Sequence, residues 1–470
     1  NEAEALEWLR DRINVEQMRP ARLDRDSVFQ LDRMRALLKA VGDPQQAFKS
    51  VHVAGTKGKG SVCEMTAACL QGCGYATGLY TSPHLMNIRE RIRLNGREIS
   101  GDDFTGLLGR IAAAADGLSS TVGIPTHFEV MTAAAFLHFA EQAVDFAVIE
   151  TGLGGRLDAT NVLTPEVAAI TAIQLEHREI LGDTAELIAA EKAGIFKPGA
   201  AALAVPQPPS VLEVLRSKAI EVGAELRVLQ QDIDFSSRFE SSTELGPHTR
   251  VSVSTPRSEY EHLPVPLWGE HQAVNCGLAL AIVDALRARG FEAPELKVAA
   301  GLAATPSNGR LEQIWNRPRI FIDGAHNPES MQALVRSVGA HVRYDSMVVV
   351  FGCAADKDVL PMLAKIAMGA DKIIFTRAER NTRAMDPREL VRRFAEVSPK
   401  MAQAAPSLKD AINTAASATG RDDIILVTGS FALAGEAKRL MQQKRRAMEA
   451  GGNAVRELKP AAKARRRSRS

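Results

Sequence analysis

Residues 51–61 read VHVAGTKGKGS, a short, largely apolar run followed by a loop of glycine, lysine, threonine and serine residues. The run Val51–Ala54 predicts a strand, and the apolar period after Ser61 predicts a helix. A loop between these elements directs backbone N–H groups and a helix N-terminus at whatever it wraps, which suits phosphate. Lys59 would then be the point charge on the β- and γ-phosphates. The alternative is a flexible Gly/Lys turn.

The loop differs from the strict phosphate-binding motif G-x-x-x-x-G-K-[ST]. Val53 stands where that motif has its first glycine, and Gly60 stands where it has Ser or Thr. We interpret the loop as a shortened variant of the motif.

Apolar runs alternate with helix-period segments along most of the chain, which is typical of α/β proteins with a parallel sheet covered by helices. In the first half the pattern predicts strands at residues 51–54, 76–80, 146–149, 167–173 and 201–205. Polar groups follow the first four strands: GTKGKGS, TSPHL, Glu150 with TGLGGRLDATN, and Glu176 with His177. Because open parallel sheets bind ligands at the carboxyl ends of their strands, these groups predict one shared site.

The second half contains a different segment and then a second alternating series. Residues 231–268 are polar with short alternating runs, which predicts a β-rich excursion or a long loop. From Arg319 onward, strands are predicted at 320–322, 347–351, 372–375 and 424–427, which make a smaller α/β domain. Pro, Ser, Asn and Gly at 304–309 indicate the joint. We expect domains at 1–305 and 306–450, and a basic, disordered tail at 451–470.

Composition excludes several classes of protein. The chain has 470 residues, 45% hydrophobic and 24% charged, which argues against disorder, collagen and a fibrous coiled coil. No apolar run approaches the roughly 18 residues of a membrane helix, and the charged start NEAEALEWLRDR does not resemble a signal peptide. Five cysteines without a C-x-x-C pair indicate reduced thiols. We therefore expect a cytoplasmic protein.

The net charge of +2 comes from the end of the chain. Residues 455–470 hold seven Lys/Arg and one Glu, a charge of +6, so the remainder carries −4. This distribution gives no reason to expect nucleic-acid binding by the body of the protein.

Three residues at strand ends are candidate ligands of a hard cation, which phosphoryl transfer requires. Glu150 ends the run DFAVI and is followed by GLGG, where a backbone can approach a ligand closely. Ser82 and His177 follow neighbouring predicted strands. Taken alone, each of these two is more often structural, and imidazole is an unusual Mg²⁺ ligand.

Two further segments carry candidate residues. GDTAELIAAEKAGIFKPG predicts a helix that begins with a capping box from Asp183 to Glu186 and ends near Gly194. Lys192 lies in its last turn, where a cation interacts favourably with the helix dipole. In the second domain, DGAHNP places Asp323 and His326 at a strand end, which suggests a second half-site. Arg310 either reaches a phosphate or is a surface residue.

Ten motifs occur in the order found in the folylpolyglutamate synthase/dihydrofolate synthase family of the Mur ligase superfamily, which the chain resembles. Between residues 51 and 358 they are VAGTKGKGSV, YTSPHL, ERIRLNG, THFEVMTAAAF, ETGLGGRLDATN, EKAGI, HQAVN, GRLE, DGAHNP and FGCAADKD. Ten motifs in order are very hard to obtain by chance. The resemblance implies a larger N-terminal P-loop ATPase domain of the Mur ligase type and a smaller Rossmann-like C-terminal domain.

The resemblance also implies roles for individual residues. The ATP-binding residues would be Gly58, Lys59, Gly60, Ser61, Asn275, Arg310 and Asp323. The Mg²⁺ ligands would be Ser82, Glu150 and His177, with two ions per active site. The pterin pocket would be lined by Thr126, His127, Phe128, Glu129, Leu157, Asp158 and Ala159. His326 would lie near the transferring phosphate, and Lys192 would be carbamylated, which turns its cation into a carboxylate for the second Mg²⁺. Catalysis would thus depend on Lys59, Lys192 and His326.

Two features depart from the family pattern. Glu176 stands where the family usually has Asp before its His, and the extra methylene would shift a bond behind the metal site. The basic tail after residue 454 has no counterpart in the family.

The implied activity is ATP-dependent amide formation. A substrate carboxylate attacks the γ-phosphate of MgATP, and the amine of L-glutamate then attacks the acyl phosphate. The substrates would be ATP, L-glutamate, and dihydropteroate or a reduced folate, and we expect a monomer that binds neither membrane nor, except through its tail, nucleic acid. We favour a bifunctional enzyme over a single-activity folylpolyglutamate synthase. THFE and GLGGRLDATN argue against a Mur-type cell-wall peptide ligase, and the intact Lys59, Glu150, Lys192 and Asp323 argue against a non-enzymatic ATP-binding regulator.

Overall fold

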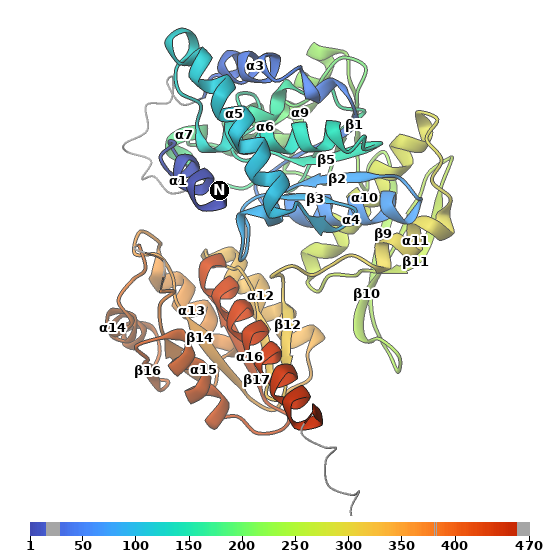
Figure 1. Cartoon of the computed structure of the whole chain (residues 1–470). Coiled ribbons are helices and arrows are strands. Elements are labelled where there is room, and N and C mark those ends of the chain that lie inside the picture. Colours follow the sequence, from blue (N-terminus) through green and yellow to red (C-terminus); the bar gives the residue numbers. More distant parts are fainter. Residues whose placement is uncertain (16–28, 380, 382, 458–470) are drawn as a thin grey trace, which may run out of the picture. The chain divides into compact units, whose positions relative to one another are not determined.

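The computed structural model describes residues 1–15, 29–379, 381 and 383–457. The chain folds into two compact α/β units (Figure 1). The first comprises Asn1–Ser307 with Ala340–Val342, and the second comprises Asn308–Gly339 with the residues from Arg343 onward. The predicted fold class is confirmed.

The first unit is built on an eight-stranded sheet with the order β4-β3-β2-β5-β1-β6-β7-β8. Its parallel strands are β1 (Lys49–Ala54), β2 (Thr77–Tyr80), β5 (Phe146–Glu150), β6 (Val167–Ile170), β7 (Ala201–Ala204) and β8 (Glu225–Val228). The antiparallel strands β3 (Ile92–Leu94) and β4 (Arg97–Glu98) form one edge. All five predicted strands are present, although β6 ends at Ile170 rather than at residue 173. Because β2, β5, β1 and β6 are neighbours, their carboxyl ends meet at one edge of the sheet, as the sequence predicts.

Helices cover both faces of this sheet (Figure 1). On one face lie α4 (Lys59–Gly72) and α10 (Glu270–Ala288), with α11 (Glu295–Ala303) against α4. The β-rich excursion is a three-stranded antiparallel sheet, β9 (Asp234–Ser242), β10 (Gly246–Ser254) and β11 (Glu259–Pro264), and β10 packs on α10. The other face carries α1 (Glu2–Arg10), α3 (Leu31–Ala40), α5 (Gly101–Val122), α6 (His127–Glu141), α8 (Ala185–Ala193) and α9 (Pro209–Val222). Short helical turns are η2 (Pro44–Gln46), η3 (Ile88–Arg91), η4 (Ala159–Val162) and α7 (Arg178–Leu181).

Strand β1 shows how the two cores are separated. Successive side chains of a strand point to opposite faces of the sheet. Val51 and Val53 are buried in the core that includes residues of α4 and α10. His52, between them, is also fully buried and therefore belongs to the opposite face, where it contacts Thr160.

The second unit contains a six-stranded sheet with the order β12-β13-β17-β14-β15-β16. The strands are β12 (Glu312–Asn316), β13 (Arg319–Ile322), β14 (Met347–Phe351), β15 (Lys372–Phe375), β16 (Ala402–Ala404) and β17 (Ile424–Thr428), and only β12 is antiparallel to its neighbour. Helices α15 (Leu408–Ser417) and α16 (Phe431–Glu457) pack together on one face (Figure 1). The connecting helices α12 (Pro328–His341), α13 (Val359–Gly369) and α14 (Pro387–Val397) cover the other, as right-handed crossovers require.

Two sequence expectations differ from the structure. Helix α8 is capped by Thr184, whose side chain accepts a hydrogen bond from Leu187 N, so the predicted capping box from Asp183 to Glu186 is wrong and the N-cap lies one residue later. Helix α16 continues to Glu457, whereas disorder was expected from residue 451. The rest of the expected tail, 458–470, lies outside the described residues.

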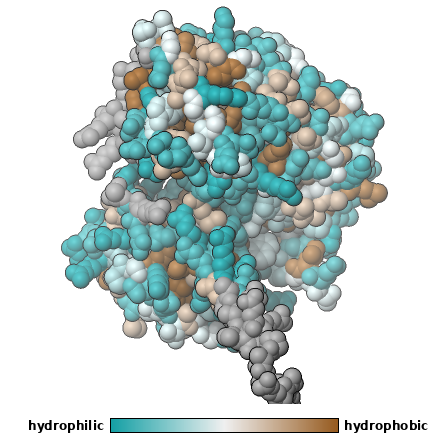
Figure 2. Space-filling view, viewed as in Figure 1, coloured by the Kyte–Doolittle hydropathy of each residue, from teal (hydrophilic) through white to brown (hydrophobic). Residues whose placement is uncertain are grey.

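The exposed surface is largely hydrophilic on the face seen in Figure 2, with hydrophobic side chains in small scattered areas. Large exposed apolar residues such as Ile220, Leu296 and Met401 belong to different elements. Within the part of the chain that is described, no helix is both long and apolar enough to cross a membrane. All five cysteines are free, and only Cys73 is not fully buried.

Candidate active site

The loop between β1 and α4 has the backbone shape that its glycines permit. Gly58, the residue that precedes α4, has φ 93°, a left-handed conformation that favours glycine. A Cβ atom at Gly58 would lie 2.4 Å from Asn275 Oδ1, and one at Gly55 would lie 1.8 Å from Thr171 Oγ1. Only glycine therefore fits at these two positions. The structure also brings Asn275, a predicted ATP contact on α10, against the loop.

The segment that follows β6 holds the loop in place. Thr56 N and Lys57 N both donate to Ala172 O, at 2.9 and 3.2 Å. Lys57 Nζ lies 3.2 Å from Glu176 Oε1. Burial acts to raise the pKa of Glu176, but the charges of Lys57, His177 and Lys59 outweigh burial and lower it. Glu176, which stands where the family usually has the shorter Asp, is thus ionised and pairs with Lys57.

Glu150 contacts two other predicted site residues, Ser82 and Lys59. Its Oε2 accepts a hydrogen bond from Ser82 N at 3.0 Å, and its Oε1 lies 3.9 Å from Lys59 Nζ. Both Glu150 and the Lys59 side chain are largely buried, with 5% and 17% of the side chain exposed. Ser61 is buried in the first turn of α4. Glu150, Lys59 and the Ser82 segment thus form one polar cluster at the carboxyl ends of β1, β2 and β5.

His177 lies at the start of α7 with φ 51°, next to Glu176. The three predicted cation ligands would supply one carboxylate, one hydroxyl and one imidazole. In the described ranges no group of three or more His, Cys, Asp or Glu side chains could hold a metal ion. Mg²⁺ nevertheless fits a site with few protein ligands, because it keeps several waters and binds phosphate oxygens.

Lys192, on α8, contacts the loop between β1 and α4. Its Nζ donates to Gly55 O at 2.7 Å, and the side chain is only 4% exposed. Burial, together with the nearby charge of Lys59, lowers the pKa of Lys192 from 10.5 to about 7. Lys192 lies in the last turn of α8, as the sequence predicts, and its side chain is buried there.

The two predicted pterin segments flank the loop that follows β5. Thr126 and Glu129 form a capping box that begins α6, with Glu129 N donating to Thr126 Oγ1 at 3.2 Å and Thr126 N donating to Glu129 Oε2 at 2.7 Å. The ring of Phe128 packs so closely on Gly152 that a Cβ there would lie 2.5 Å from it. Asp158 Oδ2 accepts from Leu153 N at 2.9 Å. His127 and Ala159 are buried at the starts of α6 and η4, while Leu157 is half-buried in the preceding turn.

The predicted half-site of the second unit lies at the end of β13. Asp323 accepts backbone hydrogen bonds from Leu311 N and Ala325 N, both at 2.8 Å. Burial raises the pKa of Asp323 to about 6, against these hydrogen bonds and the charge of Arg310. The carboxylate therefore ties the turn that carries Arg310 to the end of β13. His326 follows, with its Nδ1 2.8 Å from Gly324 O and its ring against Phe431.

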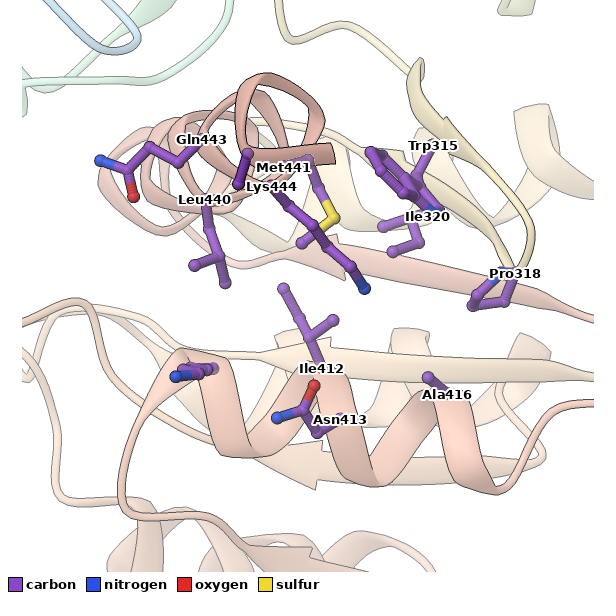
Figure 3. Close-up of a pocket in the computed structure, with 12 residues that line it drawn as sticks. Trp315, Pro318, Ile320, Ile412, Asn413, Ala416, Leu440, Met441, Gln443 and Lys444 are labelled. Atoms are coloured by element: carbon purple, nitrogen blue, oxygen red, sulfur yellow. The ribbon is translucent and has the colours of Figure 1, made fainter. Parts of the chain in front are cut away.

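Two cavities lie away from these clusters. One, of about 360 Å³, lies in the second unit between α15, α16 and the β12–β13 turn, and Trp315, Ile412, Met441 and Lys444 line it (Figure 3). The other, of about 520 Å³, is lined by residues of α4, β2, β3 and α11 in the first unit. None of the predicted site residues lines either cavity.

Sequence reasoning missed three side chains that support the site. Arg33 on α3 forms a buried ion pair with Glu129, with Nε–Oε2 at 2.9 Å. His52 and Thr160 contact each other behind Asp158. Thr160 and His52 stand inside or beside recognisable motifs, but no spacing rule pairs residues so far apart in the chain.

Comparisons with known proteins match most of each of the two units. The Mur ligase middle domain matches residues 53–283, and the Mur ligase, glutamate ligase domain matches residues 309–431. Dihydrofolate synthase/folylpolyglutamate synthase of Bacillus subtilis is 35% identical over 406 residues, covering 85% of this chain and 92% of the relative. Mycobacterium tuberculosis folylpolyglutamate synthase complexed with ADP superposes with TM-score 0.83 at 33% identity, over 94% of this chain and 99% of that one. E. coli FolC in complex with DHPP and ADP has TM-score 0.80 at 28% identity, over 94% and 98%.

Proposed function

The chain belongs to the dihydrofolate synthase/folylpolyglutamate synthase family of Mur ligases, and we propose that it joins L-glutamate both to dihydropteroate and to the γ-glutamyl tail of reduced folates. It is an ATP-dependent ligase, as its relatives are. The observation that carries the proposal is the cluster of Lys59, Glu150 and the Ser82 segment at the carboxyl ends of adjacent strands, where Lys59 Nζ and Glu150 Oε1 are 3.9 Å apart.

The chemistry requires an activated carboxyl group, because a free carboxylate is a poor acyl donor. The substrate carboxylate attacks the γ-phosphorus of ATP, ADP leaves, and an acyl phosphate forms. The amine of L-glutamate then attacks the acyl carbon, and phosphate leaves with formation of the amide. Lys59 and the N–H groups at the start of α4 stabilise the charge that develops on the transferring phosphate. Arg310 would add a second cation, and His326 would lie near the same phosphate.

We propose that Glu150, Ser82 and His177 hold Mg²⁺. When bound, the ion would neutralise phosphate oxygens during transfer. Glu150 supplies a buried carboxylate oxygen next to Lys59, which is the donor type that Mg²⁺ prefers. Lys57 and Glu176 keep the loop beside this carboxylate in place.

A second ion would need a further carboxylate, and carbamylation of Lys192 would supply it. The reaction needs a neutral amine, and a lysine whose pKa is about 7 provides one near neutral pH. The pterin would bind against Phe128 and Asp158, which contact Gly152 and Leu153 respectively in the loop that follows β5. E. coli FolC, whose structure contains DHPP and ADP, supports both small-molecule assignments.

We further propose that the protein acts as a cytoplasmic monomer. Five free cysteines suit a reducing compartment.

Phosphate release from ATP tests the proposal. Purified protein is given L-glutamate with dihydropteroate, or L-glutamate with tetrahydrofolate, in separate reactions. We expect release with both. Release with tetrahydrofolate alone would assign a single-activity folylpolyglutamate synthase, and release only with a cell-wall nucleotide precursor and its amino acid would overturn the substrate class.

A further inference from the structure

A buried chain of hydrogen bonds lies behind the proposed pterin residue Asp158. His52 Nε2 is 2.8 Å from Thr160 Oγ1. Thr160 Oγ1 is in turn 2.5 Å from Asp158 Oδ1, and Thr160 N donates to the same oxygen at 3.0 Å. His52 comes from β1 and the other two residues from the start of η4, so the chain links the central strand of the sheet to the proposed ligand loop.

The positions of the protons in the His52–Thr160–Asp158 hydrogen bonds can be assigned by elimination. Leu153 N donates to Oδ2 and Thr160 N donates to Oδ1, so both carboxyl oxygens of Asp158 are acceptors. The single hydroxyl proton of Thr160 therefore goes to Asp158 Oδ1. Thr160 Oγ1 must then accept from His52, so His52 carries its proton on Nε2. Consistent with this tautomer, His52 Nδ1 is buried without a hydrogen-bond partner among the described residues.

The surroundings hold His52 in its neutral form. His52 and Thr160 are both 0% exposed, and Asp158 is 3% exposed. Burial, with a smaller effect from the charge of Lys197, lowers the pKa of His52 to about 3. Burial also raises the pKa of Asp158, while hydrogen bonds from Thr160, Leu153 and Gly152 act against that rise. The charge on Asp158 thus depends on the groups that donate hydrogen bonds to it.

The chain of bonds also decides which oxygen of Asp158 remains for a ligand. Thr160 uses both lone pairs of Oδ1, through its N–H and its hydroxyl. Oδ2 accepts from Leu153 N, so it is the oxygen that Thr160 leaves to other donors. Without the Thr160 hydroxyl, the carboxylate could rotate about its χ2 angle, and a donor on the substrate would compete with backbone N–H groups for either oxygen.

We propose that Thr160 and His52 are positioning residues for the pterin, which fix the ionised carboxylate of Asp158 so that its Oδ2 accepts from N–H groups of the pterin ring. The inference rests on the proposed function, because it takes Asp158 as the pterin contact. A purely structural role for the same bonds would stabilise η4 but would affect all substrates alike.

The test compares two matched pairs of variants by steady-state kinetics. Thr160→Val removes the hydroxyl at nearly constant volume, and Thr160→Ser keeps the hydroxyl. His52→Leu removes the N–H donor, and His52→Gln keeps one. KM for dihydropteroate, KM for ATP, kcat and the midpoint of thermal unfolding are measured for each protein. The wild type is measured first with dihydropteroate, L-glutamate and ATP.

We expect Thr160→Val to raise KM for dihydropteroate by about tenfold or more, because an acceptor fixed by charge-assisted bonds is lost. KM for ATP should change less than about twofold, and Thr160→Ser should restore most of the affinity. His52→Leu should give a smaller rise of the same kind, and His52→Gln should reverse it. Equal changes in both KM values, or an unchanged KM for dihydropteroate in Thr160→Val, would overturn the inference. If Thr160→Val does not fold, the His52 pair decides in the same way. Absence of wild-type turnover with dihydropteroate would instead refute the proposed function.

Discussion

Lys192 should react with carbon dioxide at neutral pH, unlike an ordinary lysine. Its side chain is 4% exposed, and burial together with the charge of Lys59 lowers its pKa from 10.5 to about 7. Only the neutral amine forms a carbamate. At pH 8 a lysine of pKa 7 is about 90% neutral, whereas one of pKa 10.5 is about 0.3% neutral, a difference of roughly 300-fold.

The assay is NMR with ¹³C-labelled bicarbonate. Wild type should give a carbamate signal that Lys192→Ala lacks, and the signal should rise through about pH 7 at fixed dissolved carbon dioxide. Lys218→Ala is the matched control, because Lys218 lies on α9 with a partly exposed side chain that pairs with Glu221. The control should keep the signal.

A spectrum in which wild type and Lys192→Ala do not differ between pH 6 and 9 would refute the reasoning. A signal that appears only near pH 10 would show that the environment of Lys192 does not lower its pKa.

Three further predictions concern the loop lysine, a buried ion pair and a buried carboxylate. Lys59→Ala should abolish phosphate release while the thermal midpoint stays within a few degrees, because the contact of Lys59 with Glu150 is long at 3.9 Å; a near-normal rate would refute the phosphate assignment. Arg33→Met should lower the free energy of unfolding by about 3–5 kcal/mol in urea, since it leaves the carboxylate of Glu129 buried without its cation. The added change Glu129→Gln should recover most of that loss, and a single-variant loss below about 1 kcal/mol would contradict the argument. Asp323 binds its proton more tightly when folded, with a pKa of about 6 against 3.8, so its contribution to stability falls as pH rises from about 4 to 6. Relative to wild type, Asp323→Asn should therefore gain about 2.4 kcal/mol in unfolding free energy between pH 4 and pH 7, and a constant difference would show that the pKa is not raised.

The strands that the sequence predicts are those buried on both faces. β5 and β14, FAVIE and MVVVF, are fully buried and read as continuous apolar runs. The strands that were missed lie at or next to the edges of the sheets, and among them are the short edge strands β4, Arg97–Glu98, and β16, Ala402–Ala404. Edge strands of two or three residues carry no apolar pattern, because one side faces solvent.

Some site residues could likewise be predicted from a local sequence pattern, whereas others could not. The loop 55–61 and Glu150 could be predicted because each directly follows a strand, and adjacent parallel strands deliver their carboxyl ends to one edge. The pairs Arg33–Glu129 and His52–Thr160 are separated by 96 and 108 residues. Their contact depends on how helices and strands pack, which no local pattern reports. The start of α8 was misplaced by one residue because Asp183 and Thr184 are both good N-cap residues.

The most direct test of the account is ATP-dependent phosphate release with L-glutamate and either dihydropteroate or tetrahydrofolate, with Lys59→Ala as the control. The account predicts turnover with both pterin substrates in wild type and none in the variant. Turnover only with a cell-wall nucleotide precursor and its amino acid, or turnover that persists in Lys59→Ala, would contradict it.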